Sequence, residues 1–133
     1  MQVQHTKTVR EADVYLWAGL SGDLSPVHLD REFAASTPIG ERIAHGVMML
    51  ALVACARRRW VAETGVSPAE EAYERIRFIA PVRIGDTLTV SYGEEGAEPG
   101  DPTIVNPVQI VNQDGKVVGA ARHVVRVGTA EIR

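Results

Sequence analysis

The segment Leu20–Asp30, LSGDLSPVHLD, carries a carboxylate at Asp23 and an imidazole at His28. Gly22 and Pro26 disfavour a continuous helix, so the two groups are expected in a turn. A histidine titrates near neutrality, whereas an aspartate needs burial or a neighbour to hold a useful proton. A fixed pair of this kind can move protons to and from one water molecule, and the segment is therefore a candidate acid–base site.

Both side chains could instead serve the fold. An aspartate in a loop commonly braces a turn by accepting hydrogen bonds from backbone N–H groups. A single histidine is more often a surface residue or a hydrogen-bonded core residue than a catalyst. The spacing of Asp23 and His28 alone does not decide between these interpretations, so the sequence around them has to.

The N-terminal part of the chain predicts a strand followed by a helix. Residues 2–9 alternate loosely, which indicates an edge strand. Residues 8–20 have apolar side chains at roughly helical spacing, and Thr8 with Glu11 matches a capping box. The turn residues of segment 21–27 then end this helix.

A second, stronger helical pattern covers residues 41–63, where Ala, Leu and Met dominate. Its apolar residues surround the axis, so this helix is expected to be buried on most sides and to end at Gly65. Before it, residues 30–35 predict one helical turn with Asp30 as its cap. After it, residues 65–72 predict a loop.

The last part of the chain changes to alternation and turn residues, which predict strands. Asp114-Gly115 indicates a hairpin with a type I′ turn, because that turn requires positive φ at both central residues. Pro107 argues that its strand is bulged or lies at an edge. A turn-rich loop is expected at 95–102. The four strands are expected at 73–82, 86–95, 102–115 and 116–127.

The order of these elements predicts an α+β fold. A helix that is apolar on most faces needs cover, and an antiparallel sheet with one apolar face would supply it by curling around the helix. A chain of 133 residues fits one domain, residues 1–133.

Composition narrows the classes of protein. With 45% hydrophobic and 23% charged residues the chain is typical of a soluble globular protein. The net charge of -3 argues against a nucleic-acid partner. Arg57–Arg59 is expected to be a solvated helix end, with a docking patch for a substrate phosphate as the alternative. The longest near-apolar run, 43–56, is too short to span a membrane. A single cysteine, Cys55, with apolar neighbours predicts a buried thiol and a cytoplasmic protein.

A family resemblance appears once these elements are placed. The sequence resembles the MaoC-like, (R)-specific enoyl-CoA hydratases, whose hot-dog fold wraps a strongly curved antiparallel sheet around a long central helix. The resemblance lies in three blocks in the family's order: WAGLSGDLSPVHLDREFA at 17–34, ERIAHGVMMLA at 41–51 and RFIAPVRIGDTLTV at 77–90.

The resemblance assigns roles to particular residues. It implies that Asp23 and His28 are the catalytic pair and that Gly46 offers its backbone N–H to the thioester oxygen. Gly46 could instead permit close helix packing, and His45 could either contact substrate or orient the helix start. The chain departs from the family pattern at Ser25, where Asn is common, and at Ala54, where a hydroxyl residue is common.

The activity implied by the resemblance is the interconversion of trans-2-enoyl and (R)-3-hydroxyacyl thioesters of coenzyme A or a carrier protein. It implies a homodimer or higher homo-oligomer, no other cofactor, and no nucleic-acid or membrane partner. A hot-dog acyl thioesterase and a non-catalytic hydratase-like subunit beside a partner stay open as alternatives. No metal site is expected, because Asp23, His28 and His45 lack the tight spacing of metal ligands.

Four further residues are given structural roles. His5 and His123 lie in strand-like runs and are expected at the surface, whereas Trp17 and Phe33 are expected in the core. The length of the acyl group cannot be predicted, because it depends on how residues such as Met48 and Met49 pack.

Overall fold

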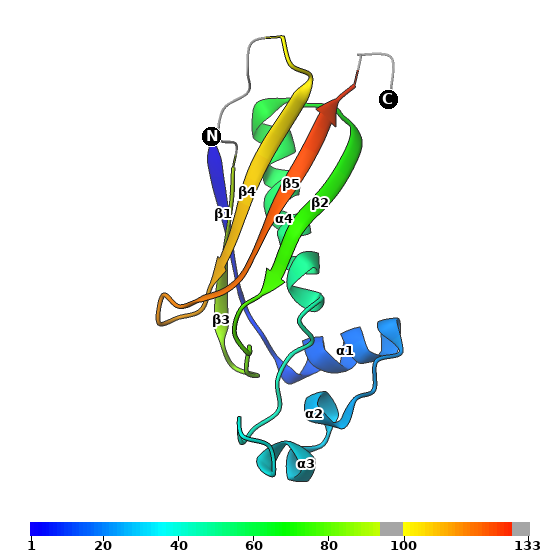
Figure 1. The fold of residues 1–133 in the computed structure, drawn as a ribbon, viewed down its shortest axis with the longest axis vertical. Helices are drawn as coiled ribbons and strands as arrows, with labels where there is room; N and C mark the ends of the chain where they lie inside the picture. The colour runs from blue at the N-terminus through cyan, green and yellow to red at the C-terminus, as the bar shows by residue number, and fades with distance from the viewer. Residues whose placement is uncertain (94–99, 129–133) are drawn as a thin grey trace.

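The computed structural model describes residues 1–93 and 100–128 (Figure 1). The predicted loop at 95–102 therefore lies largely outside the described residues. The elements, in chain order, are β1 Gln2–Thr8, α1 Glu11–Ser21, α2 Pro26–Leu29, α3 Arg31–Ala35, α4 Met48–Thr64, β2 Pro68–Phe78, β3 Thr87–Gly93, β4 Thr103–Val111 and β5 Val117–Val127.

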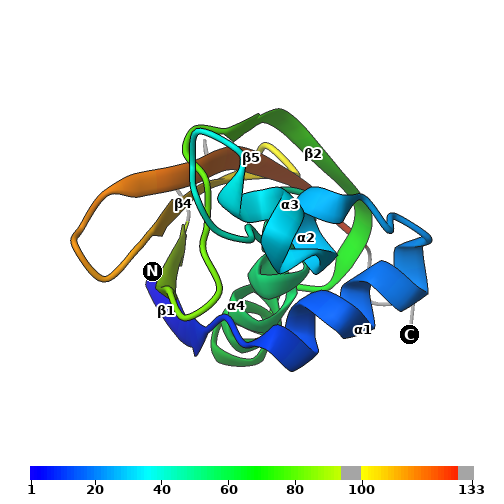
Figure 2. The ribbon, with the colours of Figure 1, turned by 90° about the horizontal axis from the view of Figure 1, so that it is seen from below.

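The strands form one five-stranded antiparallel sheet in the order β1-β3-β4-β5-β2. The sheet curves around α4, which lies along one of its faces, while α1, α2 and α3 gather near the N-terminal end of α4 (Figures 1 and 2). The predicted α+β class and hot-dog architecture are confirmed. None of the described helices is long and apolar enough to cross a membrane.

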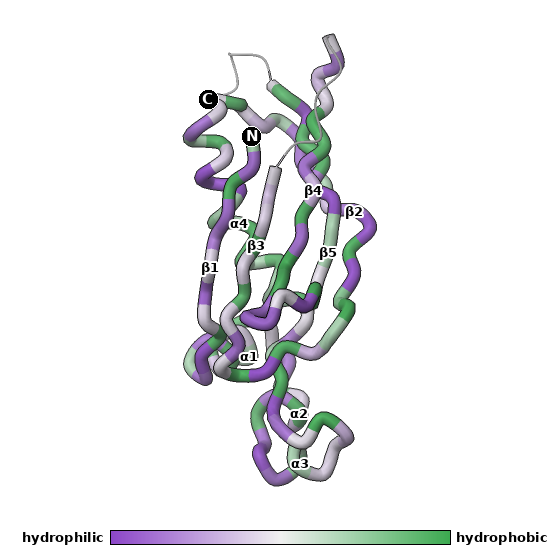
Figure 3. The backbone as a smooth tube through the Cα atoms, turned by 90° about the vertical axis from the view of Figure 1, so that its left-hand side faces the viewer, coloured by the Kyte–Doolittle hydropathy of each residue, from purple (hydrophilic) through white to green (hydrophobic). Residues whose placement is uncertain are grey.

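The hydrophobic core lies between α4 and the sheet. Its fully buried members include Val53 and Trp60 of α4, Leu88 and Tyr92 of β3, and Val118 of β5. Figure 3 shows apolar and polar residues interleaved along β4, as expected of a strand with one face against this core. The core thus fixes the position of α4, and with it the segment that leads into α4.

The expectation that α4 is buried on most sides is wrong. Its buried residues form one stripe, and Ala51, Ala54 and Cys55 are exposed on the rest of the surface. Ala and Cys count as apolar in a sequence pattern, but their small side chains gain little from burial. The thiol of Cys55 is therefore exposed, in contrast to the prediction.

The predicted helix 41–63 begins seven residues late, at Met48. Residues 41–47 run instead along the loop that precedes β3, where Ile43 bridges Arg83 and the Ala44 N–H donates to the Val82 carbonyl at 2.7 Å. These long-range hydrogen bonds replace the ones a helix would have made. Gly46 therefore lies just before the helix.

Helix ends also differ in detail. Thr8 does not cap α1, because it belongs to β1 and its hydroxyl lies 2.8 Å from the Thr87 hydroxyl. The carboxylate of Asp13 accepts from the Arg10 N–H at 2.8 Å instead. The predicted cap at Asp30 is confirmed, since its carboxylate accepts from two N–H groups of α3. Pro26 begins α2, so the break after α1 is shorter than predicted.

The strand boundaries show two corrections. The predicted loop 65–72 is wrong, because β2 already begins at Pro68, which pairs with Val127 of β5. Of the two expectations for the strand with Pro107, the edge position is wrong, because β4 lies inside the sheet, whereas its pairing with β5 has a register shift between Ile110 and Val111. On the β3 side the described ladder begins one residue after Pro107, at Val108, so the missing N–H of Pro107 interrupts no pairing there.

The hairpin between β4 and β5 forms where predicted, but its turn type is different. Of the described residues other than glycine, Arg75 alone has a positive φ, so Asp114 does not adopt the type I′ conformation. Gly115 has φ 75°, and the Asn112 side chain accepts from the N–H groups of Asp114 and Lys116. The turn is therefore a three-residue loop with a left-handed glycine.

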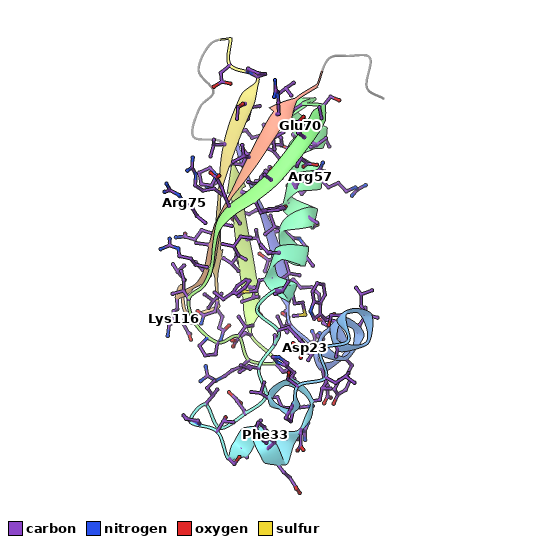
Figure 4. All side chains as sticks on the ribbon, turned by 45° about the vertical axis from the view of Figure 1, so that its right-hand side comes forward. Asp23, Phe33, Arg57, Glu70, Arg75 and Lys116 are labelled. Carbon is purple, nitrogen blue, oxygen red and sulfur yellow. The ribbon has the colours of Figure 1, made fainter. Side chains whose placement is uncertain are left out.

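The structure confirms one of the expected structural roles and contradicts two others. Trp17 packs against the core as predicted, but Phe33 is 45% exposed on α3 (Figure 4). His123 is fully buried rather than at the surface, and its Nδ1 lies 2.6 Å from the Tyr92 hydroxyl. This hydrogen bond gives the ring a partner inside the core, which the alternation of a strand cannot reveal.

The core predicts a stability difference between two leucines. Leu88→Ala removes a fully buried side chain and is expected to lower the free energy of unfolding by about 2–5 kcal/mol. Leu20→Ala, at a side chain 78% exposed, should change it by less than about 0.5 kcal/mol. Urea unfolding followed by circular dichroism measures both, and equal losses would contradict the described core.

Candidate active site

His28 is held by its place on α2 and by one hydrogen bond across the fold. It is 9% exposed, and its Nδ1 lies 2.7 Å from the Ile43 carbonyl oxygen. A carbonyl can only accept, so Nδ1 carries the hydrogen in this bond. In the neutral ring Nε2 then has a free lone pair, which makes it the atom able to take a proton.

Asp23 follows Gly22, whose φ of 78° ends α1. One carboxylate oxygen, Oδ1, accepts from the Ser25 hydroxyl at 2.5 Å and from the Ser25 N–H at 3.1 Å. The hydroxyl first, and the N–H second, lower the pKa of Asp23, because both stabilise the charged form. The other oxygen, Oδ2, lies 3.8 Å from His28 Nε2.

The gap between these two atoms has a chemical meaning. A separation of 3.8 Å is too long for a direct hydrogen bond, and two acceptors at this spacing suit one bridging water molecule. Such a water would donate one O–H to Asp23 Oδ2 and the other to His28 Nε2. The geometry can therefore polarise a water molecule between a carboxylate and an imidazole.

His45 supports both members of the pair. Its ring stacks on the His28 ring with centroids 3.8 Å apart, and its Nε2 lies 2.9 Å from the backbone carbonyl of Asp23. Its Nδ1 is buried without a hydrogen-bond partner among the described residues. Because one ring nitrogen is committed to Asp23 and the other is enclosed, the geometry favours the orienting role over contact with substrate.

Gly46 lies beside His28 in an apolar groove of about 330 Å³. Among the described residues, its backbone N–H has no protein acceptor. A Cβ at Gly46 would come within 3.0 Å of the Phe78 ring, so the glycine keeps this part of the groove open. The N–H is thus available to an oxygen atom bound opposite the pair. Figure 4 shows Asp23 near the start of α4.

The site residues also fall within reach of a single metal ion. One ligand atom from each of Asp23, His28 and His45 lies within 4.8 Å of the others. The sequence argument against a metal site rested on spacing along the chain, and the fold brings the three side chains together despite that spacing. Two of these atoms are imidazole nitrogens and one is a carboxylate oxygen, but His45 Nε2 already bonds the Asp23 carbonyl and its Nδ1 is enclosed, so His45 could bind an ion only by giving up that arrangement.

Arg42 is a site-supporting residue that the sequence analysis missed. It is 8% exposed, and its guanidinium donates to the Tyr15 hydroxyl at 2.7 Å and to Glu11 at 2.6 Å. The bond to Glu11 raises the pKa of Arg42, while the Tyr15 hydroxyl and then Arg42 lower the pKa of Glu11. This cluster ties α1 to the segment 41–47. A charged residue just ahead of an apolar run was the available signal.

The two departures from the family pattern have different consequences. Ser25 replaces the common Asn yet bonds the Asp23 carboxylate twice, so the turn is supported by a shorter side chain. Ala54 is exposed on α4 and offers no hydrogen-bonding group to the site.

Comparisons with known proteins point to one family. The MaoC like domain family matches residues 1–115. An (R)-specific enoyl-CoA hydratase of Rhodospirillum rubrum is 36% identical over 93 residues, which are 70% of this chain and 62% of that protein. The chain thus spans less than two thirds of the length of this curated relative.

Two solved structures share the fold over nearly the whole chain. An (R)-hydratase from Aeromonas caviae superimposes with a TM-score of 0.83 at 25% identity and covers 96% of this chain and 95% of that one. An R-hydratase from Pseudomonas aeruginosa has a TM-score of 0.79 at 30% identity, with coverage of 100% and 88%.

The bonds to Asp23 predict the effect of Ser25→Ala. Losing the hydroxyl should raise the pKa of Asp23 toward its ordinary value, measured by NMR titration of the carboxyl carbon. Because the folded-state pKa is lowered, these bonds stabilise the fold at neutral pH, and that stability is lost as the pH falls through the lowered pKa. In Ser25→Ala the loss of folding stability at acidic pH should therefore be smaller than in the unchanged protein.

Ser21→Ala is the matched control for this experiment. The Ser21 hydroxyl accepts from the Asp23 N–H at 3.2 Å and does not contact the carboxylate. The control should leave the pKa of Asp23 where it is in the unchanged protein. An equal rise in both variants would show that the Ser25 hydroxyl is not the cause.

Proposed function

The chain belongs to the MaoC-like domain family, and on that premise we propose that it is a hydratase and dehydratase of acyl thioesters. It would interconvert trans-2-enoyl and (R)-3-hydroxyacyl thioesters of coenzyme A or a carrier protein. The observation that carries the proposal is the 3.8 Å gap between Asp23 Oδ2 and His28 Nε2, beside the free N–H of Gly46.

In this mechanism the two acceptors hold the reacting water. As the water oxygen bonds to the β carbon of the enoyl group, one of its protons passes to the Asp23–His28 pair. The same proton is then delivered to the α carbon, so atoms balance and the pair returns to its starting state. Since the pKa of Asp23 is lowered, its carboxylate is ionised at neutral pH and ready to accept the water hydrogen.

The Gly46 N–H would stabilise the thioester oxygen, which gains negative charge while the β carbon is attacked. This group precedes α4, a helix of 17 residues, whose positive dipole end also favours an anion here. Removing one such donor typically costs about 10²–10³-fold in rate. The Asp23–His28 pair thus acts near the β carbon, whereas the Gly46 N–H acts on the thioester oxygen at the other end of the conjugated system.

His45 and Arg42 are proposed as positioning residues. His45 holds the backbone of Asp23 and the ring of His28 together, and Arg42 anchors α1 to the segment that carries His45 and Gly46. Neither role requires contact with the substrate. No cofactor beyond the arm of the thioester substrate is needed for the proton transfers described.

A homodimer formed through the β2 edge is part of the proposal. β2 is an edge strand, and Ile76, Phe78 and Ile79 at its end are 40%, 46% and 52% exposed. An unpaired edge with apolar side chains is suited to pairing with a second copy, which would cover both the backbone groups and these side chains.

We also infer the organisation and the setting of the chain. Residues 1–133 are proposed to form one hot-dog domain, because the described strands all join one sheet around one helix. A cytoplasmic location is proposed on chemical grounds. The exposed thiol of Cys55, the one cysteine of the sequence, stays reduced most readily in a reducing compartment.

Two substitutions test the catalytic pair. Asp23→Asn and His28→Ala should each lower kcat for hydration of crotonyl-CoA by about 10²–10⁴-fold, because each removes one acceptor of the reacting water. Loss of enoyl absorbance measures hydration, and a thiol reagent measures release of free coenzyme A. Thiol release by the unchanged protein would support a thioesterase instead. Unchanged turnover in both variants would refute the site.

The β2 edge predicts the mass of the assembly in solution. Analytical ultracentrifugation should find at least twice the chain mass of 14.4 kDa at micromolar concentration. Ile76→Lys places a charge on the exposed edge and should shift the protein toward the monomer. A strict monomer of the unchanged chain would contradict the proposed assembly.

A further inference from the structure

Met49 and Phe78 line the groove beside the catalytic pair from the helix and from the sheet. Met49 is 2% exposed, and its Sδ and Cε would lie 3.4 Å and 3.5 Å from a Cβ placed on Gly119 of β5. Phe78 covers the groove from β2, above Gly46. Met49 from α4 and Phe78 from β2 therefore line both the groove and a second, smaller space between α4 and the sheet.

The space behind these side chains is apolar but very small. It measures about 10 Å³ and lies between α4 and the strands β2, β4 and β5, with Val53 and Ile110 among its lining residues. A space of this size holds about one water molecule at most and cannot accept a hydrocarbon chain. The groove of about 330 Å³ and this space are separated by Met49 and Phe78, which line both.

Met49 lies one turn after the proposed oxyanion donor, because its N–H donates to the Gly46 carbonyl at 3.0 Å. Its buried side chain therefore lines the same groove as Gly46 and His28. With C–C bonds of ~1.5 Å, each pair of added carbons brings the end of an acyl chain closer to the walls of the groove.

We propose that Met49, backed by Gly119 and faced by Phe78, limits the length of the acyl group that this enzyme accepts, so that short acyl groups are preferred. The inference rests on the proposed function, since it concerns the substrate of the same site. Longer chains are excluded by a side chain and not by the backbone. Shortening Met49 joins the groove to the space in front of Gly119 and Val53, and lets the chain continue between α4 and the sheet.

Met48 supplies a matched control. It is buried to 5% and adjacent in sequence, but it lines a different apolar groove, beside Trp17 and Leu16 of α1. Met48→Ala removes the same atoms as Met49→Ala from a neighbouring buried position. Any general effect of a smaller core side chain should therefore appear in both variants, whereas a longer groove should appear only in Met49→Ala.

The experiment compares kcat/KM for trans-2-enoyl-CoA substrates of four, six and eight carbons. The unchanged protein should prefer the four-carbon substrate over the eight-carbon one by about 100-fold or more, since each excluded methylene is worth about tenfold or more. Met49→Ala should raise the eight-to-four ratio by about tenfold or more. Met48→Ala should leave the ratio as it is. Met49→Val offers a smaller cavity if Met49→Ala folds poorly, and should admit six carbons.

Binding separates this inference from the proposed function. Calorimetry with the unreactive saturated butyryl-, hexanoyl- and octanoyl-CoA reports groove depth without turnover, and the affinity order should follow the same pattern. If the protein binds short acyl groups selectively but does not hydrate enoyl-CoA, the proposed function is wrong and the inference about Met49 stands. Hydration with equal rates for four and eight carbons, or equal ratios in the Met48 and Met49 variants, would overturn the proposed wall.

Discussion

The hydrogen bond from His28 Nδ1 to the Ile43 carbonyl is the interaction on which the rest of the site depends. It joins the short helix α2 to the segment that leads into α4, and the Ile43 N–H adds a second bond between them by donating to the Val27 carbonyl at 3.2 Å. It also decides the chemistry, because it places the ring hydrogen on Nδ1 and leaves Nε2 facing Asp23. The stacked ring of His45 holds the same two segments, and the buried guanidinium of Arg42 ties the segment before α4 to α1.

The site lies where the helical end of the molecule meets the sheet. Segment 41–47 is bonded to the loop before β3 on one side and to α2 on the other, so the backbone at Gly46 is fixed before α4 begins. The carboxylate of Asp23, by contrast, is half-exposed and is held by Ser25 within its own turn. The pair thus combines a half-exposed carboxylate held within its own turn with a buried imidazole held by the rest of the fold.

Local signals explain what the sequence could predict. Asp23 and His28 were candidates because Gly22 and Pro26 predict a turn that carries both groups. The resemblance to a family, and not the spacing, gave these two residues and Gly46 their expected roles. The fold class followed from one long helix and alternating strands. What failed depends on partners far along the chain. Segment 41–47 looks helical until its bonds to Val82 and Arg83 are known. His123 alternates like a surface residue, yet the Tyr92 hydroxyl gives it a place in the core.

The strand order has a consequence for how the molecule is made. β2 pairs within the described sheet with β5 alone, and β5 is the last of the described strands. During synthesis β2 therefore leaves the ribosome well before β5. Until β5 is available, the backbone groups of β2 form hydrogen bonds with water. Closing the sheet requires contacts between residues about fifty positions apart, which slows folding and prolongs exposure of Ile76 and Phe78 to other nascent chains.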